Sequence, residues 1–270
     1  MNMTSVRGGW SVALAVLLAI GASTRGLAQE AGATGDAKAR ALVRQMTDFL
    51  GQQGQFSAKT ANTVEVVLTS GQKLQFDSVA DVAVMRPDKL RAIRTGDLEQ
   101  QELVYDGKAL TVFTQAGGVP YYATVAAPPT LGEALDFARD SLDVTAPAGD
   151  LLYANAYDIL MEDVVSGMVV GSSVVGGVRC HHLAFRGSQT DWQIWIEDGA
   201  KPLPRKMVIT SKWIVGAPQY TVTTSDWNLA PHLGADRFRF VPPKGATKID
   251  FIASGAAKAP AGQRAGEGRK

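Results

Sequence analysis

One hairpin is the clearest indication of the fold. Residues 101–114 read QELVYDGKALTVFT. Two short runs of strand-forming residues, Gln101–Tyr105 and Ala109–Thr114, flank the pair Asp106-Gly107. An Asp-Gly pair is typical of tight hairpin turns, because glycine adopts the positive φ that such a turn requires. The stretch therefore predicts two antiparallel strands.

Similar runs occupy most of the remaining chain. After a polar link at 52–55, we expect strands at 62–69, 73–84 (with a bulge near 78–80), 90–95 and 120–125. Further on, we expect strands at 167–175, 178–185, 192–197, 205–213 and 219–226, and a short last strand that carries Phe238 and Phe240. Because the connections within each group are short turns, the sheet is expected to be antiparallel.

Three segments show helical periodicity. Asp36–Leu50 places apolar residues three and four positions apart and is followed by a glycine. A capping box opens a second helix at Thr130–Leu142, and a third is expected at Asp150–Leu160. Helices that are grouped in the sequence argue against a doubly wound fold, so we predict an α+β fold with a curved antiparallel sheet of about 10–11 strands. This sheet would form an unclosed β-barrel with helices covering its concave face.

The first 28 residues are typical of a secretory signal peptide. Arg7 supplies a positive charge, and the uncharged segment Trp10–Ile20 follows it. Gly26 and Ala28 place small residues at the positions that a signal peptidase recognises, so we expect cleavage after Ala28. The apolar segment is shorter than the ~20 residues that a membrane-spanning helix needs. The mature protein is therefore expected to be exported and not transmembrane; an uncleaved N-terminal anchor is the alternative.

The charge balance excludes some classes of partner. The chain has 27 basic and 26 acidic residues and a formal net charge of +1. Loss of Arg7 and Arg25 with the leader would take the net charge to −1. A nucleic-acid-binding protein usually has a clustered basic excess, so no nucleic-acid partner is expected. Residues 253–270 are rich in Ala and Gly and are predicted to be a disordered basic tail, which leaves 36–252 as a single domain.

The residues that could carry chemistry are few. Cys180 is the one cysteine, which excludes an intramolecular disulfide, and it stands beside two of the three histidines, His181 and His182. Cys180 and His182 would share one face of a strand, and two ligands cannot close a tetrahedral zinc site. Burial of Cys180 and packing roles for both histidines are favoured over a metal site or a Cys–His nucleophile pair. No catalytic residue, metal or cofactor is predicted.

Carboxylate pairs occur at helical spacing but do not indicate a catalytic dyad. Asp136 and Asp140 lie four residues apart, as do Asp158 and Glu162. Such pairs usually mark a solvated helix face. A glycine-rich phosphate-binding loop is also absent from the sequence.

The order of several motifs resembles a known family. The motifs are Arg86-Pro87-Asp88-Lys89-Leu90-Arg91, Tyr105-Asp106-Gly107-Lys108-Ala109-Leu110, the run from Gly177 to Phe185, the run from Trp192 to Gly199, Lys201-Pro202-Leu203-Pro204-Arg205-Lys206 and Phe238-Arg239-Phe240-Val241-Pro242-Pro243. Together they resemble a family of predicted periplasmic bacterial proteins that is related to the outer-membrane lipoprotein carrier and sorting proteins. The resemblance spans roughly residues 38–250.

The resemblance implies an open barrel whose cavity, between sheet and helices, holds acyl chains. In the carriers an arginine tethers the helices that cover the cavity; the candidates here are Arg86, Arg91 and Arg94. The middle segment, 126–166, is longer than we expect in the carriers. Nine residues are the candidate cavity wall: Leu74, Phe76, Ile93, Leu103, Val112, Phe137, Tyr157, Trp192 and Ile194.

The expected function is non-catalytic binding of a lipid, an acylated protein or another apolar ligand. The alternative is an envelope protein–protein interaction or sensor module with a filled core and no lipid ligand. A third hypothesis, a hydrolase that uses Cys180 and His182, predicts loss of activity in Cys180→Ala.

Overall fold

The computed structural model describes residues 17–97, 99–142, 144 and 148–251, with side chains from Thr34 onward apart from Ala116. Residues 1–16 and the tail 252–270 lie outside this part of the chain. Most of the apolar leader segment and the predicted disordered tail are therefore outside the described residues.

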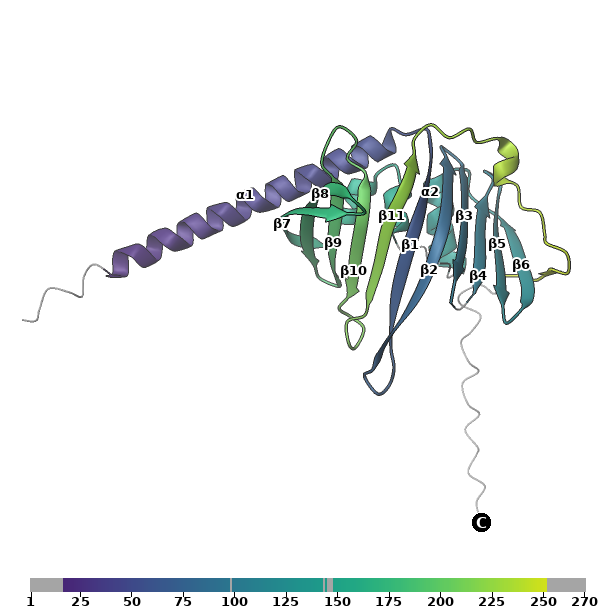
Figure 1. Cartoon of the computed structure of the whole chain (residues 1–270), viewed down its shortest axis with the longest axis horizontal. Coiled ribbons are helices and arrows are strands. Elements are labelled where there is room, and N and C mark those ends of the chain that lie inside the picture. Colours follow the sequence, from purple (N-terminus) through teal and green to yellow (C-terminus); the bar gives the residue numbers. More distant parts are fainter. Residues whose placement is uncertain (1–16, 98, 143, 145–147, 252–270) are drawn as a thin grey trace, which may run out of the picture.

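One twelve-stranded sheet forms the body of the protein, with the strand order β12-β6-β5-β4-β3-β2-β1-β11-β10-β9-β8-β7 (Figure 1). The first group of strands is β1 (Gln55–Val67), β2 (Lys73–Met85), β3 (Lys89–Gly96), β4 (Gln100–Tyr105), β5 (Ala109–Ala116) and β6 (Val119–Ala126). The second group is β7 (Val164–Val175), β8 (Val178–Gly187), β9 (Thr190–Glu197), β10 (Pro204–Ser211) and β11 (Gln219–Asn228). The short β12 (Thr247–Lys248) is added beside β6 of the first group.

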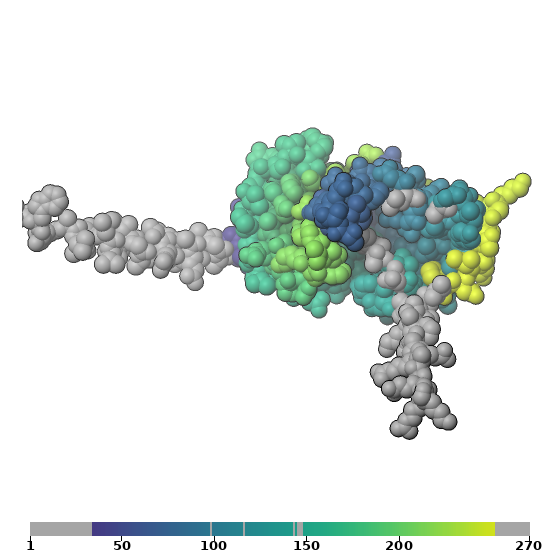
Figure 2. Space-filling model, turned by 90° about the horizontal axis from the view of Figure 1, so that it is seen from below, coloured from purple at the N-terminus to yellow at the C-terminus, as the bar shows by residue number. Residues whose placement is uncertain are grey.

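The ladder between β1 and β11 joins the two groups. These strands are antiparallel, and the register places Val64 opposite Tyr220 and Asn62 opposite Val222. In the view from below, the dark-blue β1–β2 hairpin lies between the green strands of the second group and the teal strands of the first (Figure 2). All pairs are antiparallel except β12 with β6, which is parallel.

Helices cover one face of the sheet, as predicted. They are α1 (Leu17–Gly51), α2 (Leu131–Leu142), the 3-10 helix η1 (Gly149–Leu152) and α3 (Ala156–Met161). Buried residues of all four pack with inward-facing strand residues in one apolar core. On β9, Trp192, Ile194 and Ile196 are buried while the residues between them are partly exposed, so the predicted alternation on this strand is confirmed. The α+β class and the curved, unclosed antiparallel sheet are likewise confirmed.

Two boundaries in the first half differ from the prediction. Strand β1 begins at Gln55, inside the segment expected to be a polar link, because Phe56 and Ala58 already alternate with more exposed residues and bury their side chains. No bulge occurs at Ser78–Ala80: β2 pairs residue for residue with both β1 and β3. Bulges occur instead in the β1–β11, β10–β9 and β7–β8 ladders.

The helices also differ in extent. In the described part of the chain α1 begins at Leu17, well before Asp36. The carboxylate of Asp36 accepts hydrogen bonds from the Arg40 side chain and from the backbone N–H of Gly167, so it fastens α1 to the edge strand β7. The helix expected over 150–160 is interrupted, because Tyr153 has extended backbone angles (φ −69°, ψ 150°) between η1 and α3.

The predicted last strand at Phe238 and Phe240 is wrong. Phe238 ends the 3-10 helix η2 (Ala235–Phe238) and is buried. The ring of Phe240 packs against Phe113 and Tyr122, at centroid distances of 6.1 and 5.3 Å. The alternation arises because this segment lies across the outside of the sheet without pairing in it: η2, with the buried Phe238, is next to β3, and the half-buried Phe240 packs on β5 and β6.

We expect Ile194→Ala to lower the free energy of unfolding by about 2–5 kcal/mol, since it leaves a cavity at a fully buried site. Chemical denaturation followed by circular dichroism measures the change. The matched control Val174→Ala, on an exposed edge-strand side chain, should change stability by less than about 0.5 kcal/mol. Equal effects of the two substitutions would contradict this assignment of the core.

Candidate functional site

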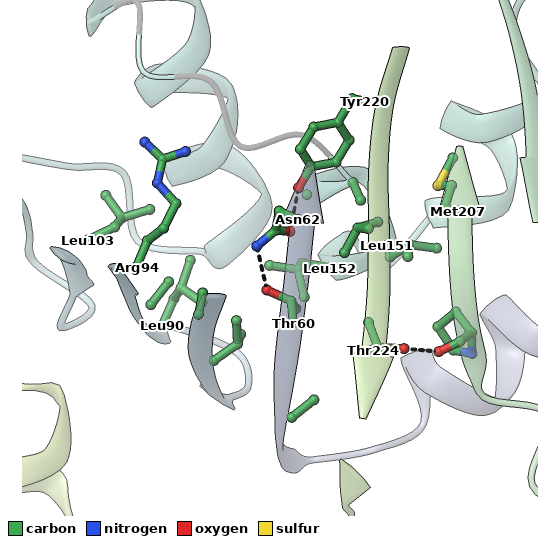
Figure 3. A pocket seen from close by; sticks show the side chains of 18 of the residues that line it. Thr60, Asn62, Leu90, Arg94, Leu103, Leu151, Leu152, Met207, Tyr220 and Thr224 are labelled. Atoms are coloured by element: carbon green, nitrogen blue, oxygen red, sulfur yellow. Dashed lines mark hydrogen bonds between the residues drawn. The ribbon is translucent and has the colours of Figure 1, made fainter. Parts of the chain in front are cut away.

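A cavity lies between the concave face of the sheet and the helices, with a volume of about 190 Å³ (Figure 3). Strands β1 to β5, β10 and β11 form its floor and walls. Leu50 at the end of α1 and Leu151 and Leu152 of η1 contribute to its helical side. The cavity is thus assembled from both strand groups and from two of the helical segments.

Small side chains create the space. One inward row runs across five strands in the register Ala58–Val82–Ala92–Leu103–Val112. The next row is Thr60–Ala80–Arg94–Gln101. Interiors are normally close-packed, so alanines at successive inward positions of a curved sheet leave volume that large side chains would fill.

Most of the lining is apolar. Aromatic and aliphatic side chains come from every part of the wall: Leu50, Phe56, Val82, Leu90, Leu103, Val112, Leu151, Leu152, Met207, Val222 and Trp227. Such a lining favours an apolar ligand, with a few polar groups to orient it.

Three polar residues of the lining form a short chain of hydrogen bonds. Tyr220 Oη donates to Asn62 Oδ1 at 2.7 Å, and Asn62 Nδ2 donates to Thr60 Oγ1 at 2.9 Å (Figure 3). Burial raises the pKa of Tyr220 to about 12, so its phenol stays neutral and acts as a donor at physiological pH. Among the described residues that line the cavity, the only charged ones are Arg94 and Lys206, and there is no aspartate or glutamate.

Arg86 is hydrogen-bonded to the helical side of the cavity. Its Nη1 donates to the backbone carbonyl of Leu152 at 2.7 Å. Burial lowers the pKa of the Arg86 guanidinium, and its Nε and Nη2 are buried without a hydrogen-bond partner. Of the three candidate arginines, Arg86 is the one that contacts η1. Arg91 instead pairs with Glu102 at 2.8 Å, and Arg94 with Glu99 at 3.0 Å.

Two of the nine candidate wall residues, Leu103 and Val112, are among the residues that line the cavity, and they stand opposite each other on β4 and β5. The other seven lie elsewhere. Ile93 is between the lining residues Ala92 and Arg94, so its side chain is on the opposite face of β3. Leu74 and Phe76 are half-buried and lie beyond the lining residues of β2, toward the β1–β2 turn.

The remaining four candidates pack in or near the core. Trp192 stacks on Phe185 with ring centroids 4.2 Å apart, and Ile194 is fully buried. The ring of Tyr157 lies 3.5 Å from the Arg44 guanidinium carbon. Phe137 is half-buried on α2, outside the set of fully buried residues of that helix.

Sequence reasoning missed most of the wall because it selected large apolar residues. The residues that make the hollow are small, notably Ala58, Ala80 and Ala92. In the sequence these residues are alanines at inward positions of three consecutive strands. They can be recognised as neighbours only when the register of the strands is known.

The Cys–His cluster lies away from the cavity and each member has a structural partner. Cys180 is fully buried, as predicted, and burial raises the pKa of its thiol. His182 stacks on Trp195 at 4.0 Å and its Nε2 is 3.0 Å from Gln193 Oε1. His181 Nε2 lies 3.2 Å from Asp198. Within the described residues, no group of three or more His, Cys, Asp or Glu side chains is placed to hold a metal ion.

The carboxylate pairs are surface contacts. Arg139 lies between Asp136 and Asp140, at 2.8 Å from each, and all three side chains are about half exposed. The Tyr153 hydroxyl donates to Asp136 at 2.9 Å. These bonds join α2 to the chain just after η1.

A family model described as Predicted periplasmic protein (DUF2092) matches residues 39–252, so the chain belongs to this family. The family resemblance inferred from the motifs is therefore confirmed. The comparison with curated proteins found no match. In the described part of the chain, no helix has both the length and the apolar character needed to cross a membrane.

Solved structures with similar folds include LprF from Mycobacterium bovis, at 14% identity, with 79% of this chain and 99% of that chain covered and a TM-score of 0.46. The lipoprotein LppX from Mycobacterium tuberculosis is 15% identical over 74% of this chain and all of its own, with a TM-score of 0.46. A LolA superfamily protein from Nitrosomonas europaea is 13% identical, with 75% of this chain and 97% of that chain covered and a TM-score of 0.34.

Removal of the Arg86 guanidinium should loosen the helical side of the cavity. In Arg86→Met, which keeps an apolar stem, we expect backbone amides of residues 149–153 to exchange with solvent about tenfold faster, since a charged donor to a carbonyl is lost. Hydrogen–deuterium exchange with mass spectrometry measures this. Arg91→Met, on the other face, is the control, and unchanged exchange in Arg86→Met would contradict the tether.

Cys180 should be unreactive in the folded protein. Because burial raises its thiol pKa and excludes reagent, we expect no reaction with a disulfide reagent at pH 8 until the protein unfolds. Absorbance on titration, with and without denaturant, measures the reaction. Rapid labelling of the native protein would contradict this prediction and would favour Cys180 as a nucleophile.

Proposed function

We propose that this protein is an exported periplasmic binding protein, cleaved after Ala28, that holds a lipid, an acylated protein or another apolar ligand in the cavity between sheet and helices. The observation that carries the proposal is the cavity itself: an apolar hollow built where both strand groups and the helices converge. The description of the family as periplasmic supports the location.

The energetics of the lining suit a ligand with an acyl chain. Each methylene removed from water contributes about 0.8 kcal/mol, with no fixed chemical partner required. The lining offers aliphatic and aromatic surface together with a small polar group of Thr60, Asn62 and Tyr220. The apolar surface provides affinity by burying the ligand, and the few hydrogen bonds orient it.

The side chains around the cavity support binding without chemical conversion. Among the described lining residues there is no cysteine, histidine, serine or carboxylate. A nucleophile paired with a base, or a pair of carboxylates, is the arrangement that covalent or acid–base catalysis needs. The residues that could supply such groups, Cys180 and His182, are engaged elsewhere in packing and hydrogen bonding.

Access to the cavity depends on the helical side. Segment η1 is one short 3-10 helix, and Arg86 attaches it to the sheet through the carbonyl of Leu152. Displacement of η1 would expose Leu151 and Leu152 together with the cavity beneath them. We propose that ligand enters by this route, with Arg86 restoring the closed arrangement.

Native mass spectrometry of protein purified from the periplasm tests the proposal. We expect the wild type to carry a reproducible lipid-sized mass, and Ala92→Phe, which places a ring in the hollow, to lose it. Val79→Phe is the control, because Val79 is 60% exposed on the opposite face of β2. A wild type that is free of ligand in every preparation and is isolated with a stable protein partner would favour the interaction or sensor module instead.

A further inference from the structure

We infer that the ligand is an amphiphile with an anionic head, a carboxylate or a phosphate, and that Arg94 binds this head. The inference rests on the proposed function and specifies its ligand class. It is carried by the charges of the cavity lining and by the position of Arg94 at its polar end.

The lining is cationic. Arg94 and Lys206 are its charged members within the described chain, and no aspartate or glutamate belongs to it; the ion-pair partner of Arg94, Glu99, is outside the lining. The Lys206 ammonium, however, lies 4.9 Å above the ring of Trp195, and Trp195 alternates with the inward residues Ile194 and Ile196. Arg94 is therefore the cation that remains to face the cavity.

The register places Arg94 among polar neighbours. It stands between Ala80 on β2 and Gln101 on β4, and Thr60 follows in the same row. In Figure 3 the side chains of Arg94 and Tyr220 lie toward one end of the cavity, whereas Leu90 lies toward the other. The charge of Arg94 acts on Tyr220, where it opposes the rise in the phenol's pKa that burial causes. The cavity thus has a positively charged polar end and an apolar end.

The present partner of Arg94 leaves it able to bind an anion. Its Nη2 donates to Glu99 Oε1 at 3.0 Å, and the Arg94 and Glu99 side chains are 35% and 29% exposed. Ion pairs that water reaches are weak, so a ligand anion can displace Glu99 or share the guanidinium with it. A guanidinium presents several donors in a planar fork that matches a carboxylate or phosphate. The same arrangement gives no favourable site for a cationic head.

Displacement of the neutral fluorescent probe N-phenyl-1-naphthylamine tests the inference. The competitors share one chain and differ in the head: dodecanoate, dodecyl phosphate, dodecan-1-ol and dodecyltrimethylammonium. We expect at least one of the two anions to displace the probe at about tenfold lower concentration than dodecan-1-ol, since a charge-assisted hydrogen bond is added to equal chain burial. The comparison of the two anions distinguishes a carboxylate from a phosphate head.

Variants assign the preference to its residue. In Arg94→Gln the preference for the anion over dodecan-1-ol, with both competitors measured on the variant, should fall to about twofold or less. Arg91→Gln, on the same strand but with its ion pair to Glu102, is the control and should keep the preference. Glu99→Gln should strengthen binding of the anion, because the competing carboxylate charge is removed.

Each other result has a definite meaning. Equal binding of anions and dodecan-1-ol by the wild type overturns the anionic head and leaves the proposed apolar binding in place. An unaltered preference in both Arg94→Gln and Glu99→Gln overturns the assignment of the head to Arg94. Failure of the probe and of all four competitors to bind overturns the proposed function as well.

Discussion

The structure depends on the pairing of β1 with β11. These strands are distant in sequence, and their ladder fuses two groups of consecutive hairpins into one sheet. Either group alone would be a smaller sheet, with β1 or β11 as a free edge. Because the fused sheet curves, its concave face needs a covering layer, which α1, α2, η1 and α3 supply. The same ladder brings Tyr220 to Asn62 and so completes the polar end of the cavity.

The two halves of the concave face are filled differently. Toward β8 and β9, large side chains such as Phe185, Trp192 and Ile194 pack against α1 in a closed core. Toward β2 and β3, alanines occupy inward positions and the covering element is the short η1. A protein that needed only stability would gain from filling this second region, since empty volume forfeits dispersion contacts. The proposed binding of an apolar ligand rests on this hollow.

The rest of the polar chemistry serves architecture. Asp36 and Arg40 attach α1 to backbone groups of β7, Arg139 joins carboxylates near η1, and His182 stacks on the outer face. Arg86 has a mixed role: it anchors η1, yet its burial with unpartnered donors is costly. Because Arg86 supplies the side-chain hydrogen bond to η1 within the described residues, η1 is the element that we propose moves when a ligand enters.

What the sequence determined by itself was local. The alternation of side chains, the Asp106-Gly107 turn and the grouping of helices identified most strands, the α+β class and the antiparallel sheet, because each of these follows from interactions over a few residues. The Phe238–Phe240 pattern shows the limit of such reasoning, since the same alternation serves to bury two rings on the outside of the sheet. The pairing of β1 with β11 and the parallel addition of β12 to β6 join segments far apart in the chain.

Only the tertiary structure decided which residues form the cavity. Leu103 and Val112 could be found from their apolar character, but Ala58, Ala80 and Ala92 matter through the volume they leave. Successive side chains of β3 point to opposite faces of the sheet. Arg94 therefore faces inward with Ala92, whereas Ile93, which was predicted to line the cavity because it is apolar, faces outward. A cavity is the absence of atoms between surfaces that distant segments bring together, so its position depends on how those segments pack and not on any one of them.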